Sequence, residues 1–254
     1  MTKQIKKIAI NFGGGYVPGL NSVIAGTVLS ADQLGWQVVG ILDGFDGLLF
    51  PERYPEGGLI KFDPERTGDL SGSVSSILGT AVRSDPFNVR TINADSFAEE
   101  VDMSDILLKR IEEEKIDAVV SVVGSRALSI LWKLNRKGLR AVCIPKSVEN
   151  DVEATMLSFG FNSALSFVAE MLERARIAAE STRKIGVVEV MGENSGWLAL
   201  QSGMAVCADA VLIPEIPFDL RKVVAKLKAK TKSGKISGLI VVAEGAKPLE
   251  GTGS

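Results

Sequence analysis

The stretch Lys7-Ile8-Ala9-Ile10-Asn11-Phe12-Gly13-Gly14-Gly15 begins the structural pattern of this chain. Its short apolar run is typical of a buried parallel strand. The glycines permit a tight turn, and the segment over residues 19–34 is expected to form a helix. A second apolar run at residues 37–42 completes a strand–helix–strand unit. Such a unit predicts two parallel strands joined by a crossover helix.

The same alternation continues along the chain. Further strands are expected at residues 118–123, 141–144, 185–190, 210–213 and 239–242. Helices are expected at residues 97–114, 125–137, 159–181, 196–207 and 219–232, while 61–90 is predicted to be loops around one short helix. This order predicts an α/β fold with mostly parallel sheets covered on both faces. A second α/β unit is expected to begin near residues 152–161.

Composition excludes several classes of protein. The chain has 254 residues, of which 46% are hydrophobic, so it can bury a sizeable core. A net charge of −2 argues against general nucleic-acid binding. With no His and only Cys143 and Cys207, a zinc site is not expected, and both thiols are predicted to be buried and free. Without a signal peptide or a long apolar run, we expect a cytoplasmic protein with no membrane partner.

The loop after the expected strand at residues 141–144 contains several candidate catalytic groups. It reads Pro145-Lys146-Ser147-Val148-Glu149-Asn150-Asp151. A carboxylate base, a cation and hydrogen-bond donors lie at the carboxyl end of a strand, where open α/β sheets bind ligands. This combination suits phosphoryl transfer to a hydroxyl. A polar turn whose last two residues cap a helix is an equally good interpretation.

Three other loops are candidates for ligand contact. Gly13–Gly15 lets the backbone approach an anion, but it lacks the Lys-Ser/Thr of a P-loop and also fits a plain tight turn. Arg83 can bind a phosphate, although a solvated loop arginine is the commoner case. The loop at Met191 and Gly192 either shapes a pocket or serves as a helix-entry turn. A solvated helix face is the interpretation for the lysines at positions 222, 226, 228, 230, 232 and 235.

Taken in order, these segments resemble the phosphofructokinase family. The matching motifs are spread along nearly the whole chain and are GGYVPGLN (14–21), DGF (43–45), LGTAVR (78–83), PKSVEND (145–151), FGFNSA (159–164), VEVMG (188–192), IPE (213–215) and VAEG (242–245). The resemblance implies two Rossmann-like α/β/α domains with mostly parallel sheets. Residues 1–155 would form the phosphoryl-donor domain and residues 156–254 a sugar-phosphate domain that is incomplete relative to the family.

The resemblance also implies an activity and partners. The family transfers a phosphoryl group from ATP or pyrophosphate, with Mg²⁺, to the 1-hydroxyl of fructose 6-phosphate in glycolysis. The partners would be a sugar phosphate, a phosphoryl donor and further subunits, in a homo-oligomer or with a related chain.

The residues that match the family's site fall into three groups. The catalytic positions are Glu149 as general base, Lys146 and Asp151. The donor-binding positions are Gly14, Gly15, Arg83, Gly124 and Ser125. The substrate-binding positions are Ser147, Met191, Gly192 and Glu244.

Four positions depart from the family pattern. Where the family carries a magnesium-binding Asp after the strand at 118–123, this chain has Ser125, and Arg126 follows it. A hydroxyl is a poor magnesium ligand, so no protein-held metal site is expected. Glu149 stands for the family's Asp, and Glu193 for the Arg after Met-Gly. These departures keep a second hypothesis open, a catalytically impaired relative that acts as a regulatory or ligand-binding subunit.

Overall fold

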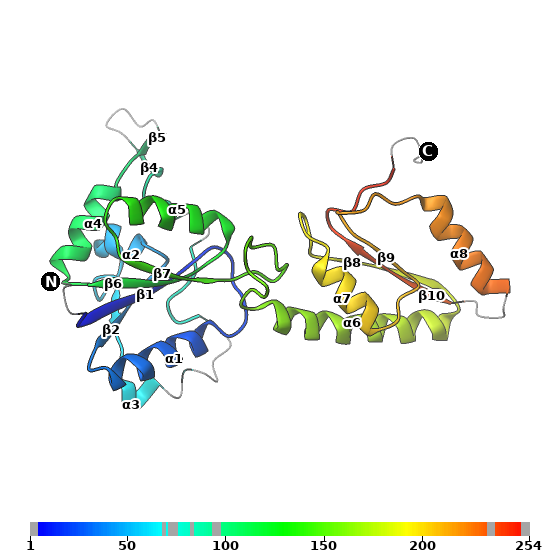
Figure 1. The fold of residues 1–254 in the computed structure, drawn as a ribbon, viewed down its shortest axis with the longest axis horizontal. Coiled ribbons are helices and arrows are strands. Elements are labelled where there is room, and N and C mark those ends of the chain that lie inside the picture. The colour runs from blue at the N-terminus through cyan, green and yellow to red at the C-terminus, as the bar shows by residue number, and fades with distance from the viewer. Residues whose placement is uncertain are drawn as a thin grey trace. The chain divides into compact units, whose positions relative to one another are not determined.

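A computed structural model describes residues 5–67, 70, 76–81, 84–92, 98–232 and 237–249. The chain forms two compact units, Met1–Lys146 and Ser147–Ser254, each with its own sheet (Figure 1). The predicted α/β class with mainly parallel sheets is confirmed. The units divide at Lys146, whereas the expected boundary was residue 155.

The first unit is built on a five-stranded sheet in the order β3-β2-β1-β6-β7. Its strands are β1 Lys7–Gly13, β2 Gln37–Ile41, β3 Leu59–Lys61, β6 Ala118–Val123 and β7 Ala141–Pro145. All neighbours are parallel except β3, which pairs antiparallel with β2 at the edge. β1 lies in the middle, and its side chains are buried on both faces, as its continuous apolar run predicts.

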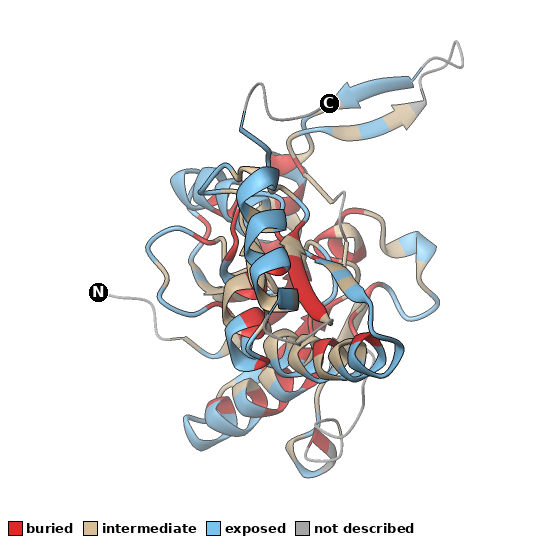
Figure 2. Cartoon of the chain, turned by 90° about the vertical axis from the view of Figure 1, so that its right-hand side faces the viewer, coloured by how far each residue is buried: buried red, intermediate tan, exposed pale blue. Residues whose placement is uncertain are grey.

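Helices cover both faces of this sheet (Figure 1). α1 Leu20–Gln33 packs on one face, and α4 Ser104–Glu113, α5 Ser125–Arg136 and the short α2 Asp46–Leu49 pack on the other. Leu107, Leu131 and Leu134 of these helices join Ala9 and Val119 of the strands in one apolar core. The buried residues lie on the strands and the inner faces of the helices (Figure 2). Two short helical turns, η1 Pro51–Arg53 and α3 Pro64–Thr67, complete the unit.

One predicted helix is partly wrong. β4 Val89–Ile92 and β5 Ala98–Val101 form an antiparallel hairpin, although residues 97–114 were expected to be helical. Cross-strand pairing of this segment outweighs the helix propensity of its Ala and Glu residues. The helix begins only after Asp102, whose carboxylate accepts a hydrogen bond from the Ser104 N–H at 2.8 Å.

The second unit has a three-stranded parallel sheet in the order β8-β10-β9. Its strands are β8 Ile185–Val190, β9 Ala210–Leu212 and β10 Gly238–Ala243. α6 Phe161–Thr182 and α7 Trp197–Ala205 pack on one face through a core that includes Leu172 and Ala199, and α8 Leu220–Lys232 lies on the other (Figure 1). No helix in the described part of the chain is long and apolar enough to cross a membrane.

Two surface expectations are corrected. Cys207 is exposed, because it follows α7 in a left-handed turn with φ of 52°, and Cys143 is half-buried, so neither thiol is fully buried. Lys230, which was expected on a solvated helix face, forms an ion pair with Asp209 at 2.7 Å. The Asp209 carboxylate also accepts a hydrogen bond from the Leu239 N–H at 2.9 Å, so it ties α8 to β10.

Replacing Asp209 with Asn is expected to destabilise the protein by about 1–3 kcal/mol at pH 7, because two partly buried donors lose a charged acceptor. Burial raises the pKa of Asp209, but the bonds from Lys230 and Leu239 outweigh it and leave the pKa lowered. A lowered pKa stabilises the fold above the unfolded value, near 3.9, and that stability is lost as the pH falls through the folded pKa.

Denaturant unfolding between pH 7 and pH 2 measures this effect. The difference between Asp209→Asn and the unmodified protein should shrink at the acid end. Asp105→Asn is the control, since the Asp105 side chain is 87% exposed and a surface ion pair such as the one it forms with Lys137 contributes little to stability. A constant difference at every pH, or an equal effect of the control, would contradict the prediction.

Candidate functional site

Three neighbouring strands of the first unit bring predicted site residues together at their carboxyl ends. Gly14 and Gly15 follow β1, Gly124 follows β6 and Lys146 follows β7. A Cβ atom built on Gly14, where φ is 85°, would lie 3.4 Å from Lys146 Nζ and 4.0 Å from Gly124 N. The chain leaves β1 toward β2 on one side and has β6 on the other, so this is the switch point where open α/β sheets bind ligands.

Lys146 is buried at this point, with 4% of its surface exposed. Its ammonium group donates a hydrogen bond to the Gly15 carbonyl oxygen. Burial lowers the pKa of Lys146 to about 8, and no carboxylate pairs with it in the described part of the chain. A buried ammonium group that has further donors and no counter-ion is suited to contact an anion.

The loop at residues 76–81 is fixed beside these strand ends. The Gly14 N–H donates to the Ala81 carbonyl at 3.0 Å, and the Asp43 N–H donates to the Leu78 carbonyl at 2.8 Å. Leu78 and Ala81 therefore hold fixed positions against the ends of β2 and β1. Arg83, the predicted donor-binding residue in the same motif, lies outside the described residues.

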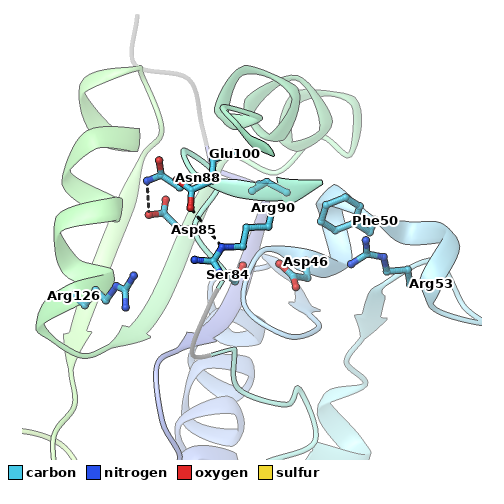
Figure 3. Close-up of a pocket in the computed structure, with 10 residues that line it drawn as sticks. Asp46, Phe50, Arg53, Ser84, Asp85, Asn88, Arg90, Glu100 and Arg126 are labelled. Atoms are coloured by element: carbon cyan, nitrogen blue, oxygen red, sulfur yellow. Dashed lines mark hydrogen bonds and ion pairs between the residues drawn. The ribbon is translucent and has the colours of Figure 1, made fainter. Parts of the chain in front are cut away.

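A cavity of about 600 Å³ opens beside the first turn of α5 (Figure 3). It is lined by Asp46, Phe50, Arg53, Ser84, Asp85, Asn88, Val89, Arg90, Glu100 and Arg126. Arg126 projects into it from α5, directly after the exposed Ser125. The sequence pattern marked Arg126 as a departure from the family that could supply positive charge in place of a metal, but it did not indicate a cavity.

The residues at the end of β6 do not fit a magnesium ion. They offer the Ser125 hydroxyl and the Arg126 guanidinium, and Mg²⁺ prefers carboxylate oxygens. Within the described ranges, no group of three or more His, Cys, Asp or Glu side chains is placed to hold a metal.

In the second unit, Ser147, Glu149 and Asp151 lie in one hydrogen-bonded turn. The Glu149 N–H donates to Ser147 Oγ at 3.0 Å, and Ser147 Oγ donates to the Asp151 carboxylate. Glu149 Oε2 accepts a hydrogen bond from the Glu193 N–H at 3.2 Å, and Ser195 Oγ donates to the Glu149 carbonyl at 3.0 Å. The contact from Ser195 was not predicted, because only tertiary folding brings this loop against residue 149.

The alternative interpretation of this segment as a helix cap is wrong. α6 begins at Phe161, and Gly160 is its N-cap residue. The Asn150 side chain instead accepts a bond from the Ser158 N–H at 2.7 Å and donates to the Met156 carbonyl at 3.2 Å. Asn150 therefore closes the loop ahead of the helix.

Met191, Gly192 and Glu244 are brought together at the ends of β8 and β10. The Glu244 N–H donates to the Val190 carbonyl at 3.0 Å, and the Gly245 N–H donates to the Gly192 carbonyl at 2.9 Å. A Cβ atom on Gly245 would lie 1.9 Å from the Glu193 carbonyl oxygen, so only glycine fits there. This close approach holds the loop after β8 against the loop after β10.

Glu149 has an electrostatic environment that favours proton transfer. Burial raises its pKa, and the charges of Asp151, Glu244 and Glu193 raise it further. The hydrogen bond from the Glu193 N–H opposes this shift but does not cancel it. A carboxylate whose pKa is raised toward neutrality is a stronger base for a hydroxyl proton than a free one.

The fold and these loops define an α/β protein with a cationic site at the carboxyl ends of one sheet and an acidic site at those of another. The family model named Phosphofructokinase matches residues 7–254, and the chain belongs to that family. The resemblance seen in the motifs is thereby confirmed.

Individual proteins named as phosphofructokinases are similar to this chain in sequence or in fold. The chain is 37% identical to ATP-dependent 6-phosphofructokinase 2 of Clostridium perfringens over 252 residues, which cover 99% of this chain and 67% of that protein. The structure of phosphofructokinase from Saccharomyces cerevisiae matches with a TM-score of 0.78 and 28% identity, over 96% of this chain and 34% of the yeast chain. A pyrophosphate-dependent phosphofructokinase from Nitrosospira multiformis shares the fold, with a TM-score of 0.77 and 23% identity over 97% of this chain and 62% of that one.

Replacing Lys146 with Met is expected to stabilise the protein at pH 7 by about 1–3 kcal/mol, because it removes a buried charge. The folded pKa of about 8 lies below the unfolded value near 10.4, so the unfolded chain binds more protons between these values. Stability of the unmodified protein should therefore rise with pH across that window.

Unfolding curves from pH 7 to pH 10 test the effect. The extra free energy of unfolding of Lys146→Met, relative to the unmodified protein, should fall as the pH approaches 10. Lys109→Met is the control, because Lys109 is 76% exposed in an ion pair with Glu113. If Lys146→Met instead destabilises the protein at pH 7, the packing and hydrogen bond of the lysine contribute more to stability than its buried charge costs.

Proposed function

We propose that the protein is a 6-phosphofructokinase-type phosphotransferase, which transfers a phosphoryl group from ATP or pyrophosphate to fructose 6-phosphate. The observation that carries the proposal is Glu149, a half-buried carboxylate whose pKa is raised, in a turn fixed by Ser147 and Asp151. The names of the relatives support the substrate class. The chain spans about two thirds of the bacterial relative, so the activity is a proposal for the whole protein.

In this proposal, Glu149 accepts the proton of the sugar hydroxyl as that oxygen attacks the phosphoryl group. Ser147 and Asp151 hold the turn in place, and Met191, Gly192 and Glu244 contact the sugar phosphate. Lys146 steadies the transferring phosphoryl group. Lys146 and Glu149 are three residues apart in the loop that follows β7.

The donor would lie against Gly14, Gly15, Gly124 and Ser125 in the first unit, with Arg83 as a further contact. We propose the first unit, Met1–Lys146, as the donor domain and the second, Ser147–Ser254, as the sugar-phosphate domain, in place of the boundary at residue 155 expected from the sequence. We propose a cytoplasmic glycolytic role and an oligomer of identical or related subunits. Magnesium is used by the family in this reaction, but no step here is assigned to it, since the end of β6 does not fit the ion.

A second candidate, a regulatory or ligand-binding subunit without catalysis, is favoured by Ser125 and Arg126 at the end of β6. The two candidates differ in turnover. Purified protein is assayed with fructose 6-phosphate, magnesium and either ATP or pyrophosphate. Formation of fructose 1,6-bisphosphate supports the first candidate, and ligand binding without product supports the second.

If the protein is active, Glu149→Gln is expected to lower kcat by about 10²–10⁴-fold while KM changes little, because it removes the general base. The acid limb of the kcat profile should also lie above the ordinary glutamate pKa, since the folded environment raises the pKa of Glu149. Steady-state kinetics between pH 5 and pH 9 measure both quantities.

Glu193→Gln is the matched comparison, because it removes a neighbouring negative charge and keeps the backbone N–H that binds Glu149. It should move the acid limb to lower pH without a large loss of rate. Full activity of Glu149→Gln would exclude this residue as the base.

A further inference from the structure

The cavity beside α5 carries three guanidinium groups, and two of them are already engaged (Figure 3). Arg90 Nε lies 3.4 Å from a Glu100 carboxylate oxygen across the β4–β5 hairpin. The Arg53 guanidinium stacks 3.8 Å from the centre of the Phe50 ring. These contacts fix the wall of the cavity that faces α2.

The third guanidinium belongs to Arg126 on the opposite wall, and it lacks contacts of this kind. Within the described residues, its guanidinium makes no hydrogen bond or ion pair with the protein. Asp85, a carboxylate that lines the same cavity, accepts hydrogen bonds from the Phe87 N–H at 3.0 Å and from Asn88 Nδ2 at 3.1 Å. Arg126 is therefore a planar donor that faces an open cavity without a protein acceptor among the described residues (Figure 3).

The cavity is lined by three carboxylates, of Asp46, Asp85 and Glu100, and also by donors that can bind the oxygens of linked phosphates. A guanidinium binds two phosphate oxygens at once through parallel N–H bonds. The Ser84 hydroxyl, which accepts a bond from the Phe45 N–H at 3.2 Å, keeps its own proton to donate. No group of three or more His, Cys, Asp or Glu side chains in the described residues is placed to hold a metal ion by itself.

We propose that this cavity binds a phosphoanhydride through Arg126 without a divalent metal ion, which rests on the proposed function in placing the donor in this unit. The shared ligand chemistry is two linked phosphates, either inorganic pyrophosphate or the diphosphate of a nucleotide. The guanidinium supplies fixed positive charge where a metal would otherwise neutralise the phosphates.

The test is isothermal titration calorimetry on the full chain in EDTA, with pyrophosphate and separately with ADP, repeated in excess Mg²⁺. We expect at least one of the two to bind in EDTA. Arg126→Gln should weaken that binding by about 10- to 100-fold, as the loss of a charged hydrogen-bonding partner does. Arg126→Lys should bind with an affinity between those of the unmodified protein and Arg126→Gln, because lysine keeps the charge and loses the planar fork.

Arg136→Gln is the matched control. Arg136 lies on the same helix, over the Trp132 ring at 5.3 Å, and does not line the cavity. It should bind like the unmodified protein. Tighter binding of ADP assigns the site to a nucleotide, and tighter binding of pyrophosphate assigns it to the inorganic ion.

The proposal is overturned if neither ligand binds in EDTA, if binding requires Mg²⁺, or if Arg126→Gln and Arg136→Gln bind equally. These results are independent of turnover. Phosphoryl transfer that occurs only with Mg²⁺-dependent donor binding would leave the proposed function standing without this inference. Metal-free binding that depends on Arg126, without any transfer, would leave the inference standing without the proposed function.

Discussion

The first unit depends on one buried polar contact at the centre of its sheet. Asn11 of β1 is 1% exposed, and its amide donates to the Gly44 carbonyl at 3.2 Å and accepts a bond from the hydroxyl of Ser121 in β6. A buried amide without partners would be costly, so these bonds fix β1 against β6 and against the loop after β2. The loops that follow these strands then emerge at defined positions around Lys146 and the cavity beside α5.

The two units present opposite electrostatic environments at their strand ends. Among the described residues, the first has a buried lysine with no carboxylate partner and an unpaired arginine in a cavity. The second has Glu149 among Asp151, Glu193 and Glu244, which raise its pKa. This difference is the basis on which we propose that the anionic donor binds the first unit and the hydroxyl acceptor the second.

Local strain and close packing mark the loops that carry these groups. Gly14 has a positive φ beside Lys146, and Asn150 adopts φ of 56° next to Glu149. Gly245 is pressed against the Glu193 carbonyl, where no side chain fits. Such conformations persist because the surrounding hydrogen bonds determine them, and they are common where a protein holds reactive groups in place.

The sequence by itself determined the α/β class, most strands and helices, and the family, because apolar periodicity and motif order are local properties of the chain. It could not determine the β4–β5 hairpin, since cross-strand pairing at residues 89–101 overrode helix propensity. It also could not place Arg126 in a cavity, or find the Ser195 contact to Glu149, because both depend on segments distant in sequence. Burial and neighbouring charge set the pKa values of Lys146 and Glu149, and only the tertiary structure decides which groups are buried together.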